Sequence, residues 1–295
     1  MTTAPTAPIA PTTLRSLQRM AQAGQPFACL TAYDATTARW LARGGVHVLL
    51  VGDTAAEVIL GFDRTVDMPL EILIALTAAV KRGAPDVVVM ADMPFMSYQA
   101  DEAEGIRNAG RFLVEGHADI VKVEADESFA PLIEKMARAG IPVCAHVGSL
   151  PQRAGLTSGY VAAGRTAAQA DQIVRDAVAL ERAGAVMLLA EAVPDEVTAR
   201  VMEATSVPLI GIGAGTACHG QVLVVHDLLG LSDKPPRFAA PVAAMGSAVA
   251  DAAAQWVARV ASRDLGGVRY TMKVGEAGRL APTGAKVGLA PGNGR

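Results

Sequence analysis

Eight short apolar runs, rich in β-branched residues, alternate along the chain with alanine-rich segments of helical length. The runs cover residues 27–31, 46–51, 87–91, 120–123, 143–147, 186–190, 209–212 and 222–225. The candidate helices cover residues 34–44, 70–82, 101–115, 127–139, 166–183, 194–204 and 242–262. Apolar strands that alternate with helices are typical of a parallel sheet covered on both faces. Eight such units predict an α/β protein with a (β/α)8 barrel, the TIM-barrel fold; a six- or seven-stranded open sheet is the alternative.

The 295-residue chain suffices for one large domain, and barrels of this length commonly fold as one domain. We expect the barrel to span residues 14–265, with a helix over residues 14–23 that closes its lower end. The Pro/Thr/Ala-rich residues 1–13 are expected to form a disordered lead-in, and the Gly-rich residues 266–295 a flexible tail.

Net charge, the length of the apolar runs and the cysteines indicate which partners and which compartment the protein can have. The formal net charge is −3 and the charges are spread along the chain, which argues against a nucleic-acid partner or an anionic membrane. No apolar run reaches the roughly 18 residues of a membrane span, and the first residues do not resemble a signal peptide. Cys29, Cys144 and Cys218 form no close pair and no metal-ligand spacing, so they suit a reducing compartment. We therefore expect a cytoplasmic protein.

The run Ile120–Glu124 carries the strongest chemical signal. Strand residues two positions apart share a face, so Lys122 and Glu124 project from one side of an otherwise apolar strand. Lys and Glu are rarely buried without partners. The pair is either a structural ion pair or a strand end that delivers a cation and an anion into a pocket. The second interpretation is favoured, because ionisable residues recur at other strands.

Ionisable residues or glycines stand at nearly every strand exit, where the active sites of barrels lie. They are Asp34, Asp53, Asp92, Glu124, His146, Glu191, the glycines of residues 211–215, and the pair His226 and Asp227. Asp and Glu also favour helix starts, and for Asp34 a helix N-cap is the preferred interpretation. The glycine cluster resembles a phosphate-binding loop only weakly, because it lacks dinucleotide-site spacing; close ligand approach or simple packing would serve as well.

Three of these acids, Asp53, Asp92 and Glu124, would repel one another at a barrel mouth unless a positive group lay between them. A hard divalent cation such as Mg²⁺ is the simplest such group. His146 is either a core histidine or part of the site. Glu191 ends so apolar a run that its pKa should be raised, as a general acid or base needs; an N-cap of the next helix is the alternative.

Seven short motifs then follow one another in order. They are Thr31-Ala32-Tyr33-Asp34, Val51-Gly52-Asp53-Thr54, Ala91-Asp92-Met93-Pro94-Phe95, Val121-Lys122-Val123-Glu124, Val143-Cys144-Ala145-His146-Val147-Gly148, Glu191-Ala192-Val193-Pro194 and Gly211-Ile212-Gly213-Ala214-Gly215. Together they resemble the ketopantoate hydroxymethyltransferase family, also called 3-methyl-2-oxobutanoate hydroxymethyltransferases, over residues 14–260. Each motif is short, but seven in order are highly specific.

The resemblance implies a barrel of the phosphoenolpyruvate mutase/isocitrate lyase type. It implies transfer of a hydroxymethyl group from 5,10-methylenetetrahydrofolate to 3-methyl-2-oxobutanoate, a step of pantothenate and coenzyme A synthesis. It also implies one Mg²⁺ per subunit and a homo-oligomer, commonly a decamer. The corresponding residues here are the metal-site acids Asp53, Asp92 and Glu124, the keto acid contacts Asp53, Thr54, Asp92, Lys122 and His146, and the acid or base Glu191.

The chain departs from the family pattern around this shell of residues. Thr54 stands where Ser is usual, and Ala125-Asp126 stands where Gly-Gly is usual, so that Asp126 adds a negative charge near the site. Leu76 replaces a His, Val161 replaces a Lys, and His219 replaces an Asp.

These departures leave the acceptor keto acid and the one-carbon donor open. One alternative is a paralogue that uses another 2-keto acid or another aldehyde donor. A second is a lyase of the same superfamily, although Cys144-Ala145-His146 lacks the lysine and glycines of the mobile loop that such lyases carry. The least favoured is a non-enzymatic regulatory paralogue, which would be expected to lose the metal ligands.

Overall fold

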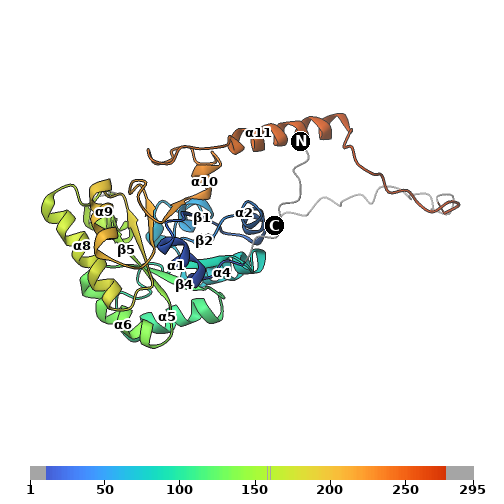
Figure 1. The fold of residues 1–295 in the computed structure, drawn as a ribbon. Coiled ribbons are helices and arrows are strands. Elements are labelled where there is room, and N and C mark those ends of the chain that lie inside the picture. The colour runs from blue at the N-terminus through green and yellow to red at the C-terminus, as the bar shows by residue number, and fades with distance from the viewer. Residues whose placement is uncertain (1–10, 158, 160, 277–295) are drawn as a thin grey trace, which may run out of the picture. The chain divides into compact units, whose positions relative to one another are not determined.

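Eight parallel strands close into one barrel in the computed structural model, which describes residues 11–276 apart from residues 158 and 160 (Figure 1). The strands are β1 (Phe27–Thr31), β2 (Val48–Val51), β3 (Val88–Asp92), β4 (Ile120–Glu124), β5 (Val143–Gly148), β6 (Met187–Glu191), β7 (Leu209–Ile212) and β8 (Gly220–Leu223). Each strand pairs with the next along the chain, and β8 pairs with β1. The predicted (β/α)8 barrel is therefore confirmed, and the open sheet is wrong.

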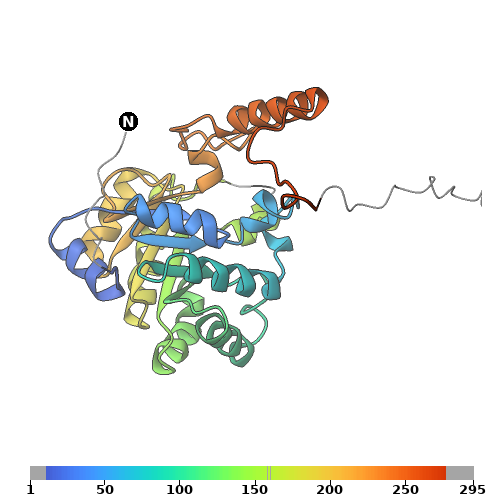
Figure 2. The same cartoon turned by 90° about the vertical axis from the view of Figure 1, so that its right-hand side faces the viewer.

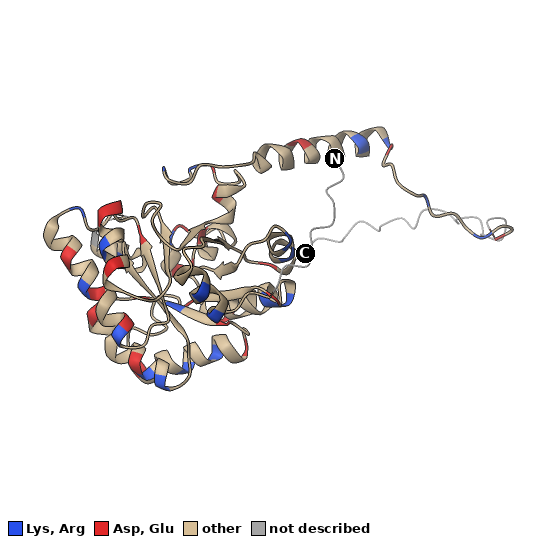
Figure 3. Cartoon of the chain, in the orientation of Figure 1, with Lys and Arg blue, Asp and Glu red and all other residues tan. Residues whose placement is uncertain are grey.

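Helices connect successive strands as far as β7 and lie outside the ring of strands (Figure 1, Figure 2), and β7 is followed by β8 without a helix between them. The longer ones are α2 (Ala35–Arg43), α4 (Leu70–Gly83), α5 (Glu102–Val114), α6 (Ala130–Arg138), α8 (Ala167–Arg182) and α9 (Asp195–Ala204). Shorter turns are α3 (Ala55–Val58), η1 (Thr65–Asp67), η2 (Glu127–Phe129), η3 (Pro151–Arg153), α7 (Ala154–Thr157) and α10 (Val225–Leu228). Acidic and basic residues occur together on α5, α6 and α8 (Figure 3).

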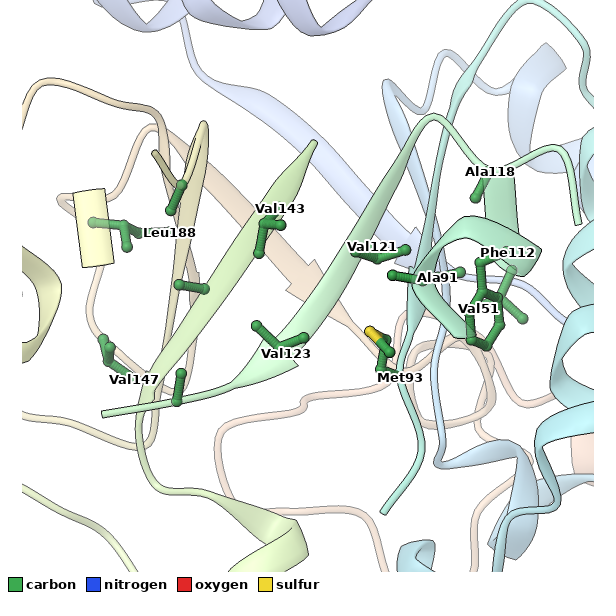
Figure 4. Close-up of a cluster of buried hydrophobic side chains, with 14 of the residues drawn as sticks. Val51, Ala91, Met93, Phe112, Ala118, Val121, Val123, Val143, Val147 and Leu188 are labelled. Carbon is green, nitrogen blue, oxygen red and sulfur yellow. The ribbon is translucent and has the colours of Figure 1, made fainter. Parts of the chain in front are cut away.

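The side chains of each strand alternate between the barrel interior and the surrounding helices. In β4, Val121 and Val123 point outward and pack in the core between strands and helices (Figure 4). Ile120 belongs to a separate cluster inside the barrel. Lys122 and Glu124, which share its face, therefore point into the interior nearer the C-terminal end of the strand.

The lower half of the barrel interior is apolar. Its buried side chains are Leu17, Phe27, Cys29, Val48, Leu50, Val88, Met90, Ile120, Cys144, Met187, Leu189, Ile210 and Val222. Several of these are the first residues of their strands, so the cluster fills the N-terminal end of the barrel. Leu17 comes from helix α1 (Leu14–Gln22), which Thr13 caps, and it is 0% exposed. Helix α1 thus closes this end of the barrel, as the sequence predicts.

Strand β8 lies two residues earlier than predicted. It covers Gly220–Leu223, and Val225 already begins α10, so His226 and Asp227 lie in a short helix and not at a strand exit. The sequence pattern treats glycine as a strand breaker, but here packing requires it. A Cβ on Gly220 would meet the ring of Phe27 at 2.3 Å, and β1 pairs with β8 at this level.

The chain divides into two compact units, with the boundary between Gly246 and Ser247. The predicted domain bounds, a barrel over residues 14–265, stay a prediction. Most of helix α11 (Met245–Ser262) belongs to the second unit. Its side chains are exposed, among them the apolar Trp256, Val257 and Val260. The expected lead-in and tail fall largely outside the described residues. None of the described helices is both long and apolar enough to cross a membrane.

Candidate active site

The alternation of the strands gathers the predicted site residues at the C-terminal end of the barrel. Asp92 on β3 lies level with Lys122 on β4, and Glu124 lies level with His146 on β5. The last residue of β6, Glu191, lies level with Gly148. Asp53 and Thr54 follow β2 directly. The structure therefore brings together every residue that the sequence assigns to the keto acid, the metal and the acid or base.

Lys122 is the cation at the centre of this group. Its Nζ lies 3.1 Å from Asp92 Oδ1 and 3.2 Å from His146 Nδ1. Burial lowers the pKa of this ammonium, but the nearby carboxylates, Asp92 first, raise it above its usual value. Lys122 thus stays charged. Its acidic partner is Asp92 on the neighbouring strand β3, and not Glu124 on its own strand.

The three carboxylates carry more negative charge than one lysine can offset. Burial, and then the charge of Asp92, raises the pKa of Asp53 to about 7. Burial also raises the pKa of Glu124 well above its usual value, and the charge of Asp53 adds to this. Asp92 accepts a hydrogen bond from the Asp53 amide at 3.1 Å through Oδ2, while its Oδ1 is buried without a hydrogen bond among the described residues. With Lys122 as the nearby cation, the three acids still have room for further positive charge.

The chemistry of these acids fits a hard divalent cation. Within the described ranges, no three His, Cys, Asp or Glu side chains are close enough together, as they stand, to surround a metal ion. Mg²⁺ does not need such a cage, because it commonly takes one or two carboxylates and completes its shell with water or substrate oxygens. Asp53 and Asp92 meet that requirement, since both are buried carboxyl groups at the same end of the barrel.

His146 is neutral and has a defined tautomer. Burial, and then the charge of Lys122, lowers its pKa well below the usual value. Lys122 has only donors, so Nδ1 of the ring must accept its hydrogen bond, and the ring proton is on Nε2. Nε2 lies 3.4 Å from Glu191 Oε2, and the described residues give it no hydrogen-bond partner. His146 thus stands between Lys122 and Glu191, with one ring nitrogen toward each.

Glu191 differs from the other acids in its access to solvent. Its side chain is 24% exposed, against 1% for His146. Burial nevertheless raises its pKa to about 7, although the charge of Lys122 acts in the opposite direction. Helix α9 begins at Asp195 without a side-chain cap, so the N-cap interpretation of Glu191 is wrong. An accessible carboxyl group that titrates near neutral pH is suited to proton transfer.

The remaining strand-exit residues divide between structural and site roles. Asp34 caps α2 by accepting hydrogen bonds from two backbone amides, as the preferred interpretation holds. Thr54 has the Tyr33 hydroxyl 3.2 Å from its Oγ1, which fixes the position of that oxygen near Asp53. In the glycine cluster, a Cβ on Gly215 would meet the Asp195 carboxylate at 2.2 Å, so packing explains the glycine.

Sequence reasoning missed two polar residues of the site. Gln152, in η3, is buried, and its side-chain amide donates to Asp53 Oδ2 at 2.9 Å. Tyr98 is also buried, and its hydroxyl accepts a hydrogen bond from the Glu124 amide at 3.0 Å. Both lie in loops after strands. Neither carries a charge or an apolar periodicity, so the pattern contains no signal for them.

The sequence matches the profile of a family described as ketopantoate hydroxymethyltransferase over residues 11–266. It is 42% identical over 248 residues to the 3-methyl-2-oxobutanoate hydroxymethyltransferase of Halorhodospira halophila, covering 84% of this chain and 90% of that protein. It is 47% identical over 229 residues to the enzyme of that name from Alkalilimnicola ehrlichii, covering 77% and 82%. The chain belongs to the ketopantoate hydroxymethyltransferase family. The prediction of a hydroxymethyltransferase enzyme is thereby confirmed.

Solved structures of other enzymes share the fold of this chain. Phosphonopyruvate hydrolase in complex with oxalate and Mg²⁺ matches with a TM-score of 0.58 at 16% identity, over 90% of this chain and 91% of that one. A 2,3-dimethylmalate lyase matches with a TM-score of 0.54 at 19% identity, over 92% and 95%, and is described as a PEP mutase/isocitrate lyase superfamily member. This ketopantoate hydroxymethyltransferase family member therefore has the predicted barrel type.

Two departures from the family pattern now have a structural account. Asp126 pairs with Arg153 at 2.6 Å, and hydrogen bonds from Ser128 and Arg153 lower its pKa although burial opposes them. The extra negative charge is thus offset by a neighbouring cation. His219 accepts a hydrogen bond from the Leu209 amide at 3.0 Å, so it holds the start of β7 and does not reach the site.

A groove lies beside the mouth at the ends of β4 and β5. Its volume is about 560 Å³, within the range of small-molecule sites. It is lined by Asp126 and Arg153 on one side and by Gln172 and Asp176 of α8 on the other. Gly148, level with Glu191, also lines it. The groove therefore adjoins the end of the barrel where Glu191 lies.

Proposed function

We propose that this chain transfers a hydroxymethyl group from 5,10-methylenetetrahydrofolate to C3 of 3-methyl-2-oxobutanoate, in the synthesis of pantothenate and coenzyme A. One observation carries the proposal: Glu191, with a pKa of about 7, stands at the open end of a buried group of three carboxylates and one lysine. The names of the curated relatives support the choice of acceptor.

The cation expected at this site is one Mg²⁺ per subunit. Asp53 and Asp92 would hold it, with Glu124 as the third acid beside it. When bound, Mg²⁺ would supply a Lewis acid that draws electron density from the keto group. The solved phosphonopyruvate hydrolase complex contains Mg²⁺, and that ion, although it belongs to another protein, supports the same expectation here.

The chain's own residues would bind and orient the keto acid. Lys122 offsets the charge of the substrate carboxylate, because its ammonium is held charged by the surrounding acids. His146 presents its Nε2 proton toward the same space, and Thr54 presents the hydroxyl that Tyr33 holds. The keto acid is thus fixed with its C3 toward the open end, where Glu191 lies.

Glu191 would remove the C3 proton once the keto acid is bound. A carboxylate with a pKa near 7 is a stronger base than an ordinary one, and about half of it is ionised at pH 7. Water adds to the methylene carbon of the folate as its two carbon–nitrogen bonds break, and the two nitrogens take up the two protons of the water, which leaves the one-carbon unit at the level of formaldehyde. The C3 carbanion then forms the new carbon–carbon bond to that carbon, and the oxygen takes the proton held by Glu191. The groove lined by Arg153 and Asp176 is where we expect the folate.

The alternatives have weaker support. A superfamily lyase with a reactive cysteine is disfavoured, because Cys144 is buried in the barrel and its pKa is raised to about 12, chiefly by burial. A paralogue with another 2-keto acid or another aldehyde donor shares the chemistry at C3 and differs only in the substrates. A non-enzymatic paralogue would not need a base of raised pKa at the mouth.

Two further expectations concern the cell and the assembly. We propose a homo-oligomer, a decamer by family resemblance. We also propose a cytoplasmic location. Cys29, Cys144 and Cys218 are all free and buried, which suits a reducing compartment.

Exchange of the C3 proton tests the proposal before any folate is added. The protein is incubated in D₂O with 3-methyl-2-oxobutanoate and Mg²⁺, with and without a chelator, and the C3 proton is followed by NMR. We expect the C3 proton signal to disappear with Mg²⁺ and to persist with the chelator. Binding without exchange would contradict the proposed acceptor, and other 2-keto acids would then be compared in the same assay.

The variant Glu191→Gln separates binding from proton transfer. It keeps the side-chain size but cannot accept the proton, so exchange should fall by at least about 100-fold while keto acid binding stays within a few-fold. Calorimetric titration with the keto acid measures the binding. Exchange at the wild-type rate, or binding lost together with exchange, would contradict the role given to Glu191.

A further inference from the structure

The side-chain amide of Gln152 is completely engaged. Its Nε2 donates to Asp53 Oδ2 at 2.9 Å and to the Met93 carbonyl oxygen at 3.0 Å. Its Oε1 accepts from Gln99 Nε2 at 2.8 Å and lies 3.0 Å from the Tyr98 hydroxyl. An amide has two donors and two lone pairs, and all four are used. Its orientation is therefore fixed, because a flipped amide would set its oxygen against a carboxylate and a carbonyl.

The same residue also holds a second carboxylate. The backbone amide of Gln152 donates to Glu124 Oε2 at 2.9 Å. The Tyr98 hydroxyl, which touches the Gln152 side chain, accepts a hydrogen bond from the backbone amide of Glu124. Gln152 thus ties the loop after β5 to acids that come from the ends of β2 and β4.

Each of the three carboxylates has one oxygen held by an amide. Asp53 Oδ2 and Glu124 Oε2 are held by Gln152, and Asp92 Oδ2 is held by the Asp53 amide. Asp53 Oδ1 and Glu124 Oε1 receive no hydrogen bond within the described part of the chain. Lys122 Nζ is near Asp92 Oδ1 and His146 Nδ1 is 4.0 Å from Glu124 Oε1.

We propose that Gln152 is a positioning residue for the divalent cation: by holding one oxygen of Asp53 and one of Glu124, it turns their free oxygens toward the ion. The inference rests on the proposed cation site. Partners that orient metal-binding carboxylates typically contribute about 10- to 100-fold to metal affinity. Gln152 therefore acts on the cation through the acids and does not touch the substrate.

The direct test is Mn²⁺ binding, followed by the EPR signal of free Mn²⁺ in titrations of the full chain without substrate. Gln152→Met keeps the length of the side chain but removes the donor to Asp53. We expect its Kd for Mn²⁺ to rise about 10- to 100-fold. The matched control is Gln99→Met, which removes a hydrogen bond to the same amide without touching a carboxylate, and its Kd should change less than about 3-fold.

A second readout distinguishes positioning from loop stability. In the C3 exchange assay, Gln152→Met should need at least about 10-fold more Mg²⁺ for half-maximal rate, yet approach the wild-type rate at saturating Mg²⁺. A loop that is simply misplaced would lower the rate at every Mg²⁺ concentration. If Gln152→Met does not fold, Tyr98→Phe, which keeps the ring, should show the same pattern with a smaller change.

The outcomes separate the two proposals. If the wild-type chain does not bind Mn²⁺, the proposed cation site is wrong, and the inference fails with it. If the wild type binds Mn²⁺ and Gln152→Met binds it equally well, the cation site stands and the role of Gln152 is wrong. Equal losses in Gln152→Met and Gln99→Met would also overturn that role, because they would reflect the loop and not the donor to Asp53.

Discussion

Glu191 shows how one position in a barrel can give a carboxyl group two properties that usually exclude each other. It ends an inward-facing row of apolar residues, which raises its pKa to about 7, and it stands at the open end, where 24% of its side chain is exposed. Ala192, directly after it, has a φ of 48°, a left-handed conformation that is uncommon for a residue other than glycine. Strain of this kind is often found next to catalytic groups.

The raised pKa of Glu191 predicts the pH dependence of C3 exchange. The carboxylate is the active form, and it is lost as pH falls through about 7, so the rate should level off above pH 8 and drop about tenfold per pH unit below pH 6. NMR exchange rates at saturating Mg²⁺ and keto acid measure this. A rate that is flat from pH 5 to 8 would contradict the assignment of Glu191 as the base.

A site residue could be predicted from the sequence only where an ionisable side chain interrupts or ends an apolar strand. Lys122 and Glu191 break apolar strands, so burial and alternation single them out. Gln152 follows Pro151 in a loop and looks like any polar turn residue, yet it contacts two acids. Its role depends on contacts between residues 99 and 28 positions apart, which no local pattern contains.

At the scale of elements, the two-residue period of the strands determines which side chains can reach the mouth. The period is readable for β3 to β6, because each apolar run carries an ionisable residue at or near its C-terminal end. It is misleading for β8, where Gly220 belongs to the strand because the Phe27 ring leaves no room for a side chain. That requirement comes from β1, 193 positions away by residue number (220 − 27), and not from the run itself.

The join between β5 and β6 should be sensitive to a single added methyl group. Gly148 has a φ of 96°, and a Cβ there would meet the Glu191 carbonyl oxygen at 2.6 Å and Val193 at 2.7 Å. We expect Gly148→Ala to lower C3 exchange at least about tenfold, because a shift of this size moves the base. Gly155→Ala, where the added Cβ would meet nothing within 4 Å, should leave the rate unchanged. Equal rates in the two variants would contradict this account.

Helix α1 should contribute to stability without contributing to chemistry. Leu17 is completely buried in the apolar end of the barrel, so Leu17→Ala should lower the free energy of unfolding by about 2–5 kcal/mol. Urea denaturation measures this, and the exposed neighbour Gln18→Ala is the control. The C3 exchange rate of folded Leu17→Ala should stay near the wild-type value, because Leu17 belongs to the opposite end. A large loss of exchange in the folded variant would show that the two ends are coupled.

At the scale of the whole molecule, the buried acids link folding to pH. The pKa values of Asp53 and Glu191 are raised to about 7, against roughly 4 in an unfolded chain, so the folded state holds more protons between these values. Stability without metal should therefore fall as pH rises from 4 to 7. A cation that binds the ionised acids should reverse that loss by mass action.

This linkage predicts a pH-dependent effect of Mg²⁺ on thermal stability. With a chelator, the Tm should be lower at pH 8 than at pH 6, if other groups contribute equally at the two values. Addition of excess Mg²⁺ should raise the Tm by several degrees at pH 8 and by less at pH 6, because protons compete with the cation at Asp53. Scanning calorimetry measures both. An equal rise at the two pH values would contradict the linkage, and Na⁺ at matched ionic strength is the control.

The apolar cluster that fills the N-terminal end of the barrel has a consequence for the order in which substrates bind. Leu17 and its neighbours fill the lower barrel, so a molecule can reach the buried acids only from the end where Glu191 lies. Under the proposed function, two reactants share this one entrance, so the keto acid should bind first and the folate above it, and the enlarged product should leave only after the spent folate. The chain should therefore follow an ordered reaction scheme, in which the keto acid product competes with the keto acid substrate and not with the folate.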